Sequence, residues 1–307
     1  MADLRNALAR QAEIVAKITA YFAAENVLPV DTRLLRDHGV TDPAVNNMLV
    51  SDEAGDALGY LQFSPEFAMK ILLAHGSGDI YQLCRAFRGG ESGRLHRSEF
   101  RILEWYRLGF DHHRLMDDVQ ALLAPLIPDR CWDRVSYREL FLAQIGFEPH
   151  LASNEQLFAQ AQMSLSLESR DVHDRSLLFD IIFSHQIQPK LTSGQALFIF
   201  DFPKEQAAYA LLRDEDPQVA SRFELLVDGV ELANGYHELT DPKEQLHRHE
   251  VERTRRARAG QEDVSFDPEF IAALERGMPN CAGVALGVDR LLMIILGADS
   301  LLAAEMR

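Results

Sequence analysis

The residues best suited to chemistry lie in the stretch 87–106, FRGGESGRLHRSEFRILEWY. Near its glycines lie the cationic or partly cationic side chains of Arg88, Arg94, His96 and Arg97. They flank two adjacent glycines, which allow a ligand to approach the backbone closely. Such N–H donors suit an anion with several oxygens, and a polyphosphate is the natural candidate. The alternative interpretation is a solvated turn whose arginines only keep the protein in solution.

The same stretch predicts a β-hairpin with a long tip. Residues 81–87 and 100–106 show the apolar alternation of strands, whereas the polar, glycine-rich residues 89–98 do not. Two antiparallel strands would therefore present a basic loop to the ligand.

A pair of carboxylates lies in a second predicted hairpin. Strands at 222–227 and 230–236 are joined by Asp228-Gly229, a favourable two-residue turn, and they carry Glu224 and Glu231. Opposed carboxylates repel each other unless a cation lies between them, and Mg²⁺ with phosphate oxygens is the usual solution. The alternative is that one of the two carboxylates faces solvent.

Glu238 follows the second of these strands. In a regular strand, residues 231 and 238 point to opposite faces, so we expect a bend between them. Gly235 is the candidate for a β-bulge at this point. Glu238 would then be able to bind a cationic group of the substrate.

Residues 63–73, FSPEFAMKILL, predict a helix whose first residues could bind a ligand. Ser64 is expected as its N-cap, with Pro65 at the first helical position and Glu66 in the first turn. Glu66 is either a helix-start carboxylate alone or a ligand-binding group. Arg290 is placed similarly, at the start of an apolar helix.

The remaining patterns predict an amphipathic helix at 4–22, a short strand at 27–30, an irregular mobile loop at 33–60, helices within 112–186, a buried strand at 196–202 and a helix at 242–258. The 112–186 region shows no charged or histidine cluster arranged for chemistry. The arginine run 253–258 is interpreted as a solvated face, with a docking patch as the alternative.

The composition and net charge of the chain disfavour some classes of partner. The 307 residues are 47% hydrophobic and 25% charged, which is ordinary for a globular protein, and the net charge of −16 disfavours nucleic acid and anionic membranes as partners. Three cysteines without metal-site spacing favour a reducing, cytoplasmic location. The chain contains no run of about 18 apolar residues, so no membrane partner is expected.

In combination, the segments at 87–106, GVELANGYHELTD (229–241) and GMPNCAGVALGVDRLLMIILG (277–297) resemble class II aminoacyl-tRNA synthetase catalytic domains. The resemblance implies an α+β fold with a mostly antiparallel sheet flanked by helices. It also implies one catalytic domain over 1–307 with a helical insertion at about 112–186, and a homodimer formed through the opening helix. Arg33 departs from the pattern, because the family usually has proline there.

The resemblance also implies roles for individual residues. Those expected to bind ATP are Arg88, Gly89, Gly90, His96, Arg97, Phe100, Glu231, Leu232, Gly287 and Arg290. Arg88 and Arg290 are expected to be catalytic, Phe100 to stack on adenine, and Glu224 with Glu231 to hold Mg²⁺. Those expected to bind the amino-acid substrate are Ser64, Pro65, Glu66, Tyr106, Asn234, Glu238 and Ala285.

The narrower resemblance is to truncated relatives of lysyl-tRNA synthetases that ligate (R)-β-lysine to elongation factor P. The first motif begins within the first dozen residues, so no anticodon-binding domain and no tRNA substrate are expected. This chain differs from these relatives at Gly89-Gly90, where the relatives have Asn-Glu, and at Arg97, where they have Asn. It also differs at Phe63, which replaces a small polar residue. The resemblance implies an ATP-dependent ligase that forms a β-lysyl-adenylate. The alternatives are a lysine-type adenylating enzyme with another acceptor, or a catalytically weak binding paralogue.

Overall fold

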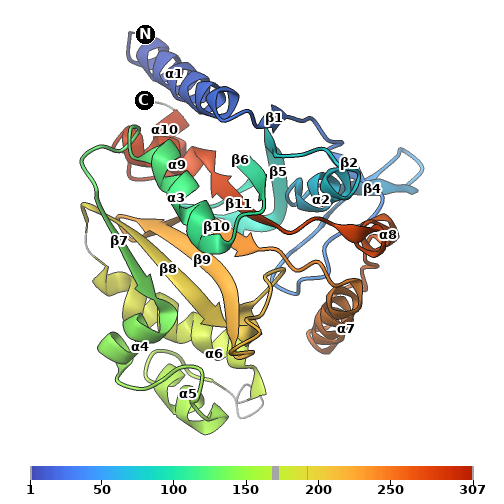
Figure 1. The fold of residues 1–307 in the computed structure, drawn as a ribbon, viewed down its shortest axis with the longest axis vertical. Coiled ribbons are helices and arrows are strands. Elements are labelled where there is room, and N and C mark those ends of the chain that lie inside the picture. The colour runs from blue at the N-terminus through green and yellow to red at the C-terminus, as the bar shows by residue number, and fades with distance from the viewer. Residues whose placement is uncertain (1, 168–172, 192, 306–307) are drawn as a thin grey trace. The chain divides into compact units, whose positions relative to one another are not determined.

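A computed structural model describes residues 2–167, 173–191 and 193–305 of the chain (Figure 1). The chain forms two units, of which unit 1 comprises Met1–Phe110 with Leu239–Arg307 and unit 2 comprises Asp111–Glu238. In both units, mostly antiparallel strands are flanked by helices, so the predicted α+β class is confirmed. The prediction that residues 1–307 act as one catalytic domain stays a prediction.

Four strands of unit 1 lie side by side in the order β1-β5-β6-β11. Their bounds are Leu28–Pro29, Ile80–Ser92, Arg97–Leu108 and Cys281–Gly287. Strand β1, which was predicted, pairs parallel to β5, and the other neighbours are antiparallel. The long central strands β5 and β6 therefore carry the stretch that the sequence singles out.

The two faces of this sheet are covered by different helices. Helix α1 (Ala2–Ala24), predicted from its amphipathic pattern, places Phe22 on one face, where it stacks on Tyr81 with ring centroids 4.3 Å apart. Helices α2 (Glu66–Ala74) and α8 (Pro268–Gly277) cover the other face and form a hydrophobic core with Tyr106. Residues at alternate positions of β6 therefore lie in separate environments.

The long loop predicted at the tip of the first hairpin is wrong. Strand β5 continues to Ser92 and β6 begins at Arg97, so only residues 93–96 form the turn. The pairing is irregular between Phe87 and Ser92. Gly90 has a φ of 75°, which explains how a glycine-rich segment extends the strand without regular pairing.

The irregular loop predicted at 33–60 is also wrong. This region forms a small antiparallel sheet in the order β2-β4-β3, with bounds Leu35–Arg36, Ala57–Leu61 and Met48–Ser51. Asp52 closes the turn between β3 and β4, because its Oδ1 accepts hydrogen bonds from the N–H groups of Ala54 and Asp56. The polar residues that suggested disorder therefore form a tight turn.

Unit 2 contains four strands in the order β10-β9-β8-β7. Their bounds are Val230–His237, Val219–Val227, Gln195–Pro203 and Cys131–Ser136. Strands β8, β9 and β10 were predicted, whereas β7, which pairs parallel to β8, was not. Its residues CWDRVS are exposed or half-buried and lack a buried alternation, so the local pattern carried little strand signal.

Among the described residues, the α-helices of unit 2 are α3 (His112–Leu123), α4 (Tyr137–Ile145), α5 (Asn154–Ala161) and α6 (Arg175–Ile182). Tyr137 and Phe141 of α4 pack with Phe179 of α6 against Ile199 and Leu226 of the strands. This aromatic core explains why proline-separated helical segments fold onto one face of the strands.

The β9–β10 hairpin has the predicted turn but not the predicted bulge. Asp228 and Gly229 have φ values of 53° and 76°, as a type I′ turn requires. Gly235 pairs regularly with Phe223, and the register shift lies instead between Glu231 and Ala233. The prediction of a bulge at Gly235 is therefore wrong, because the strand accommodates its extra residue close to the turn.

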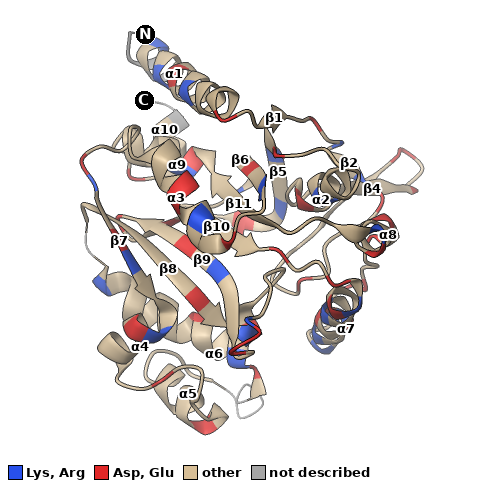
Figure 2. Ribbon diagram, in the orientation of Figure 1, with Lys and Arg blue, Asp and Glu red and all other residues tan. Residues whose placement is uncertain are grey.

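Helix α7 (Pro242–Arg258) has the predicted bounds, and Asp241 caps it. Its arginine run is not a uniformly solvated face. Arg256 is buried and donates hydrogen bonds from Nη1 to the carbonyl oxygens of Asp42 and Val45. Figure 2 shows basic residues along this helix, and Arg253 pairs with Asp263. One residue of the arginine run, Arg256, therefore stabilises the segment around residues 42–45.

The remaining helices of unit 1 are α9 (Val288–Ile295) and α10 (Leu301–Glu305). The predicted apolar helix that begins near Arg290 is confirmed as α9. Within the described ranges, no helix has both the length and the apolar content needed to cross a lipid bilayer.

Candidate active site

The start of helix α9 brings Arg290 to the β5–β6 hairpin. Its Nη2 lies 3.1 Å from His96 Nε2, and its Nε donates to the carbonyl oxygen of Leu95 at 3.2 Å. The neighbouring Asp289 accepts hydrogen bonds from both the backbone N–H and the Nε of Arg101, at 2.8 and 2.7 Å. The helix start is therefore fixed on strand β6, and two predicted phosphate-binding side chains from distant segments meet.

Arg88 lies between two aromatic rings. Its Cζ is 3.9 Å from the ring centroid of Phe63 and 4.9 Å from that of Phe100. Glu91 Oε1 lies 3.9 Å from Arg88 Nη1. Stacking on aromatic faces orients a guanidinium group. Phe100, expected to stack on adenine, therefore contacts the predicted catalytic arginine in this structure.

The two positions after Arg88 each require glycine, for different local reasons. Gly89 N–H donates to the carbonyl oxygen of Asn46 at 2.8 Å, and a Cβ at Gly89 would lie 2.9 Å from that oxygen. Gly90 requires its positive φ. At Gly89, the backbone is therefore approached closely by Asn46 of the same chain, and not by a ligand as predicted.

A buried polar pair lies on the face of β6 that α2 and α8 cover. The Tyr106 hydroxyl donates to Glu104 Oε1 at 2.6 Å, and both residues are 2% exposed. On the neighbouring strand β11, Gly283 lies opposite Tyr106 and Ala285 lies opposite Glu104. A buried carboxylate beside such small residues is suited to bind a substrate cation.

Glu104 was missed in the sequence analysis. The signal was present, because Glu104 and Tyr106 are two residues apart in a strand and therefore share a face. A carboxylate within the otherwise apolar segment 102–106 should have drawn the same attention as the tyrosine. Gln82, which lies opposite Glu104 on β5, was also missed and is likewise buried.

The predicted substrate-binding segment at 64–66 differs in detail. Helix α2 begins at Glu66 with Pro65 at the cap position, so the prediction of Ser64 as N-cap is wrong. Ser64 Oγ nevertheless accepts a hydrogen bond from the Glu66 N–H at 3.3 Å. Glu66 Oε1 accepts one from Lys70 Nζ at 2.5 Å, so a cation of the same helix already contacts this carboxylate.

In unit 2, Glu224 and Glu231 line one cavity of about 240 Å³. Arg222, Asp180 and Tyr137 contribute to the same lining. Glu224 forms an ion pair with Arg222, whose Nε also donates to Asn234 Oδ1 at 3.2 Å. Three predicted site residues are thus brought together around an arginine that was not predicted.

Burial raises the pKa of Glu224 to about 7, and the Glu231 carboxylate adds to the increase while Arg222 opposes it. A carboxyl group with this pKa loses its proton readily when a cation enters the cavity. Because two carboxylates share the space with one guanidinium, the cavity is suited to hold a divalent ion.

The remaining predicted residues have simpler surroundings. Leu232 is the extra residue of the register shift in β10 and is buried. Glu238 is buried just beyond β10, where it forms a β-bridge with Ala210. Gly287 precedes α9 at its cap position, and Arg97 begins β6 opposite Ser92.

Comparison with known proteins covers almost the whole chain. The family model for class II tRNA synthetases (D, K and N) matches residues 1–304. An elongation factor P–(R)-beta-lysine ligase from Vibrio cholerae serotype O1 is 43% identical over 301 residues, covering 95% of this chain and 92% of the relative.

Two further relatives carry the same name. The protein from Pasteurella multocida is 41% identical over 304 residues, covering 98% of this chain and 94% of the relative. The protein from Edwardsiella ictaluri is 42% identical over 299 residues, covering 96% and 92%. The similarity therefore extends through both units.

Proposed function

Because the chain belongs to the family of class II tRNA synthetases (D, K and N), we propose that it is an ATP-dependent ligase. It adenylates (R)-β-lysine and transfers the acyl group to a lysine side chain of elongation factor P. The names of relatives 41–43% identical over nearly their whole length support this choice of substrate and acceptor.

The observation that carries the proposal is the buried Glu104–Tyr106 pair. A carboxylate that is 2% exposed is suited to an ammonium group, and Ala285 beside it leaves little bulk on β11. The pair would bind the side-chain amine of the substrate. Asn234 and Glu238 stay predicted for the same amine, and Glu66 stays predicted for the amino group nearer the carboxylate.

In the first step, a carboxylate oxygen of the amino acid attacks the α-phosphorus of ATP, and pyrophosphate leaves. No covalent bond to the protein forms, so catalysis rests on positioning and charge stabilisation. Arg88, oriented by Phe63 and Phe100, would bridge the α-phosphate and the carboxylate. Arg290 and His96 would bind the outer phosphates. Gly89, Gly90, Arg97, Leu232 and Gly287 complete the proposed nucleotide-binding set.

In the second step, the lysine amine of elongation factor P attacks the acyl carbon. An amide bond forms, AMP leaves with the bonding electron pair, and the amine loses a proton. The same guanidinium groups that stabilise charge in the first step would stabilise the departing phosphate oxygen.

Glu224 and Glu231 would hold Mg²⁺. The fit is supported by their common cavity and by the burial that raises the pKa of Glu224, since a cation would stabilise its charged form. When bound, the ion supplies charge neutralisation on phosphate oxygens. Arg222 would orient Glu224 and Asn234.

The proposal is tested by incubating the chain with ATP, Mg²⁺, (R)-β-lysine and elongation factor P, and measuring the mass of the acceptor. We expect the mass increase of one β-lysyl group, and its loss in the Arg290→Ala variant. Arg85→Ala is the matched control, because Arg85 lies in the same hairpin but is exposed and pairs with the exposed Glu99. An unchanged acceptor mass alongside an active reference ligase contradicts the proposal.

Amino-acid selectivity is measured separately by pyrophosphate exchange. We expect faster exchange with (R)-β-lysine than with α-lysine. A preference for α-lysine together with an unmodified acceptor would favour a lysine-type adenylating enzyme with a different acceptor. No exchange and no ATP binding by calorimetry would favour a binding paralogue.

We further propose a homodimer formed through α1, in a reducing compartment such as the cytoplasm. Leu8 on this helix is more than half exposed, which supports an apolar contact. The three free cysteines support the compartment. Light scattering of the wild type and of Leu8→Glu tests the dimer, since the variant should be monomeric.

A further inference from the structure

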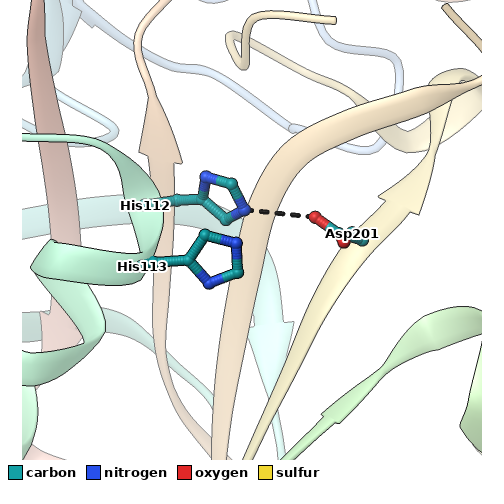
Figure 3. A group of neighbouring side chains, drawn as sticks. All are labelled: His112, His113 and Asp201. Atoms are coloured by element: carbon teal, nitrogen blue, oxygen red, sulfur yellow. Dashed lines mark hydrogen bonds and ion pairs between the residues drawn. The ribbon is translucent and has the colours of Figure 1, made fainter. Parts of the chain in front are cut away.

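Unit 2 contains a cluster of two histidines and an aspartate that the proposed function does not use (Figure 3). His112 and His113 begin helix α3, and Asp201 lies in strand β8. One potential ligand atom of each residue lies within 4.8 Å of the other two. The sequence analysis expected no charged or histidine cluster arranged for chemistry within 112–186, and the third member of this group, Asp201, comes from a strand outside that region.

The backbone of Asp201 is strained in a way that directs its side chain. Its φ of 63° is left-handed, which is uncommon for a residue other than glycine, and the β8–β9 register shifts between Phe200 and Phe202. Such irregularities re-aim a side chain at a cost that the surrounding structure must offset. Here the carboxylate is turned toward α3, where it contacts His112.

The contacts converge on one oxygen, Asp201 Oδ1. His112 Nε2 lies 3.1 Å from it, and Arg213 Nη2 lies 2.7 Å from it. The same Arg213 nitrogen is 3.5 Å from His113 Nε2. A cationic N–H group therefore occupies the position toward which a carboxylate oxygen and an imidazole lone pair are directed.

Burial separates two of the three potential ligands from Arg213. His112 and Asp201 are 4% and 8% exposed, and His112 Nδ1 is buried without a hydrogen-bond partner in the described part of the chain. His113 is half-buried, and the Arg213 side chain is 28% exposed and is followed by the exposed acidic residues 214–216. The guanidinium can therefore move into solvent toward other carboxylates, whereas His112 and Asp201 are held in place by their burial.

We propose that His112, His113 and Asp201 bind a divalent transition-metal ion of the zinc type, and that Arg213 occupies its place in the metal-free protein. Two imidazole nitrogens and one carboxylate oxygen are a common donor set for such ions, with water at the fourth position. The ion would connect the start of α3 to β8 and stabilise unit 2. Metal and Arg213 exclude each other from the site.

The test measures Zn²⁺ affinity of the full chain by competition with a chromophoric chelator, and coordination geometry by the visible absorption of bound Co²⁺. We expect one ion per chain and an about 10- to 100-fold loss of affinity in His113→Gln and Asp201→Asn. Arg213→Gln should bind about tenfold more tightly, because a competing cation is removed. His185→Gln, which alters an exposed histidine of the same unit, is the matched control.

The Arg213 variant keeps the proposal testable if Asp201→Asn fails to fold, since removal of a partly exposed side chain leaves the ligands intact. Zn²⁺ should also raise the thermal midpoint of the wild type but not that of His113→Gln. Equal Zn²⁺ affinity in wild type and His113→Gln, or weaker binding by Arg213→Gln, would overturn the proposal.

Discussion

The buried carboxylate on β6 and the carboxylates in the cavity of unit 2 have different neighbours. On β6, Glu104 contacts a neutral phenol and lies beside small residues. In unit 2, Glu224 and Glu231 share their space with the guanidinium of Arg222. A carboxylate with a neutral neighbour is suited to a monovalent ammonium group, whereas two carboxylates partly compensated by arginine are suited to a divalent ion.

The largest expected effect is on the β6 face. Glu104→Gln removes the negative charge and should lower kcat/KM for (R)-β-lysine about 10³-fold, because an ammonium would be buried without its counter-charge. ATP affinity should not change. Pyrophosphate exchange measures the first quantity and calorimetry the second. Glu99→Gln, at an exposed position of the same strand, serves as control.

Glu231→Gln alters the other region and should lower activity about 100-fold, since one of two cavity carboxylates is neutralised. Raising the Mg²⁺ concentration should restore part of the activity, whereas raising (R)-β-lysine should not. Glu215→Gln on the exposed 214–216 segment is the control for a general loss of negative charge. If extra substrate rescued Glu231→Gln, the distinction between the two regions would fail.

Ala285→Gly sharpens the description of the β6 face. Removing the methyl group opposite Glu104 should shift the ratio of exchange rates with (R)-β-lysine and α-lysine by about tenfold toward α-lysine. The ratio of kcat/KM values for the two amino acids is the measurement. An unchanged ratio would mean that Ala285 does not contact the substrate.

The smallest effect is the pH dependence of stability in the unit 2 cavity. Burial raises the pKa of Glu224 from its ordinary value of 4.5 to about 7, so between these values the folded chain keeps a proton that the unfolded chain releases. The contribution of Glu224 to stability therefore falls as pH rises through this interval. Denaturant unfolding of wild type and Glu224→Gln should show a difference that grows from pH 4.5 to 7 and is constant above.

Elements defined by local rules were predictable. The amphipathic period of α1, the Asp-Gly turn between β9 and β10 and the start of α9 near Arg290 all depend on neighbouring residues. The shared cavity of Glu224 and Glu231 was also accessible, because a two-residue turn sets which residues of a hairpin lie on the same face. The cross-strand partners themselves were not, since the register shift places Leu226 opposite Glu231 and Asn234 opposite Glu224.

Other features depend on distant residues, and the sequence analysis missed them. Gly89 contacts Asn46, and Arg256 contacts the carbonyl oxygen of Val45, so two residues assigned to a ligand or to solvent have partners within the protein. The 33–60 sheet was missed because its strands are short and separated by turn residues. Short strands obtain their stability from pairing, which no local pattern encodes.

The sequence by itself determined the class of the fold, the family and most of the residues that belong to the proposed site, because helix period, turn chemistry and motif order are local properties. Only the tertiary structure decided which carboxylates are buried, that Arg222 lies with Glu224, and that His112 and His113 meet Asp201. Burial and charge pairing are set by strand register and helix packing between segments far apart in the chain, 89 residues for His112 and Asp201 and 188 for Arg101 and Asp289.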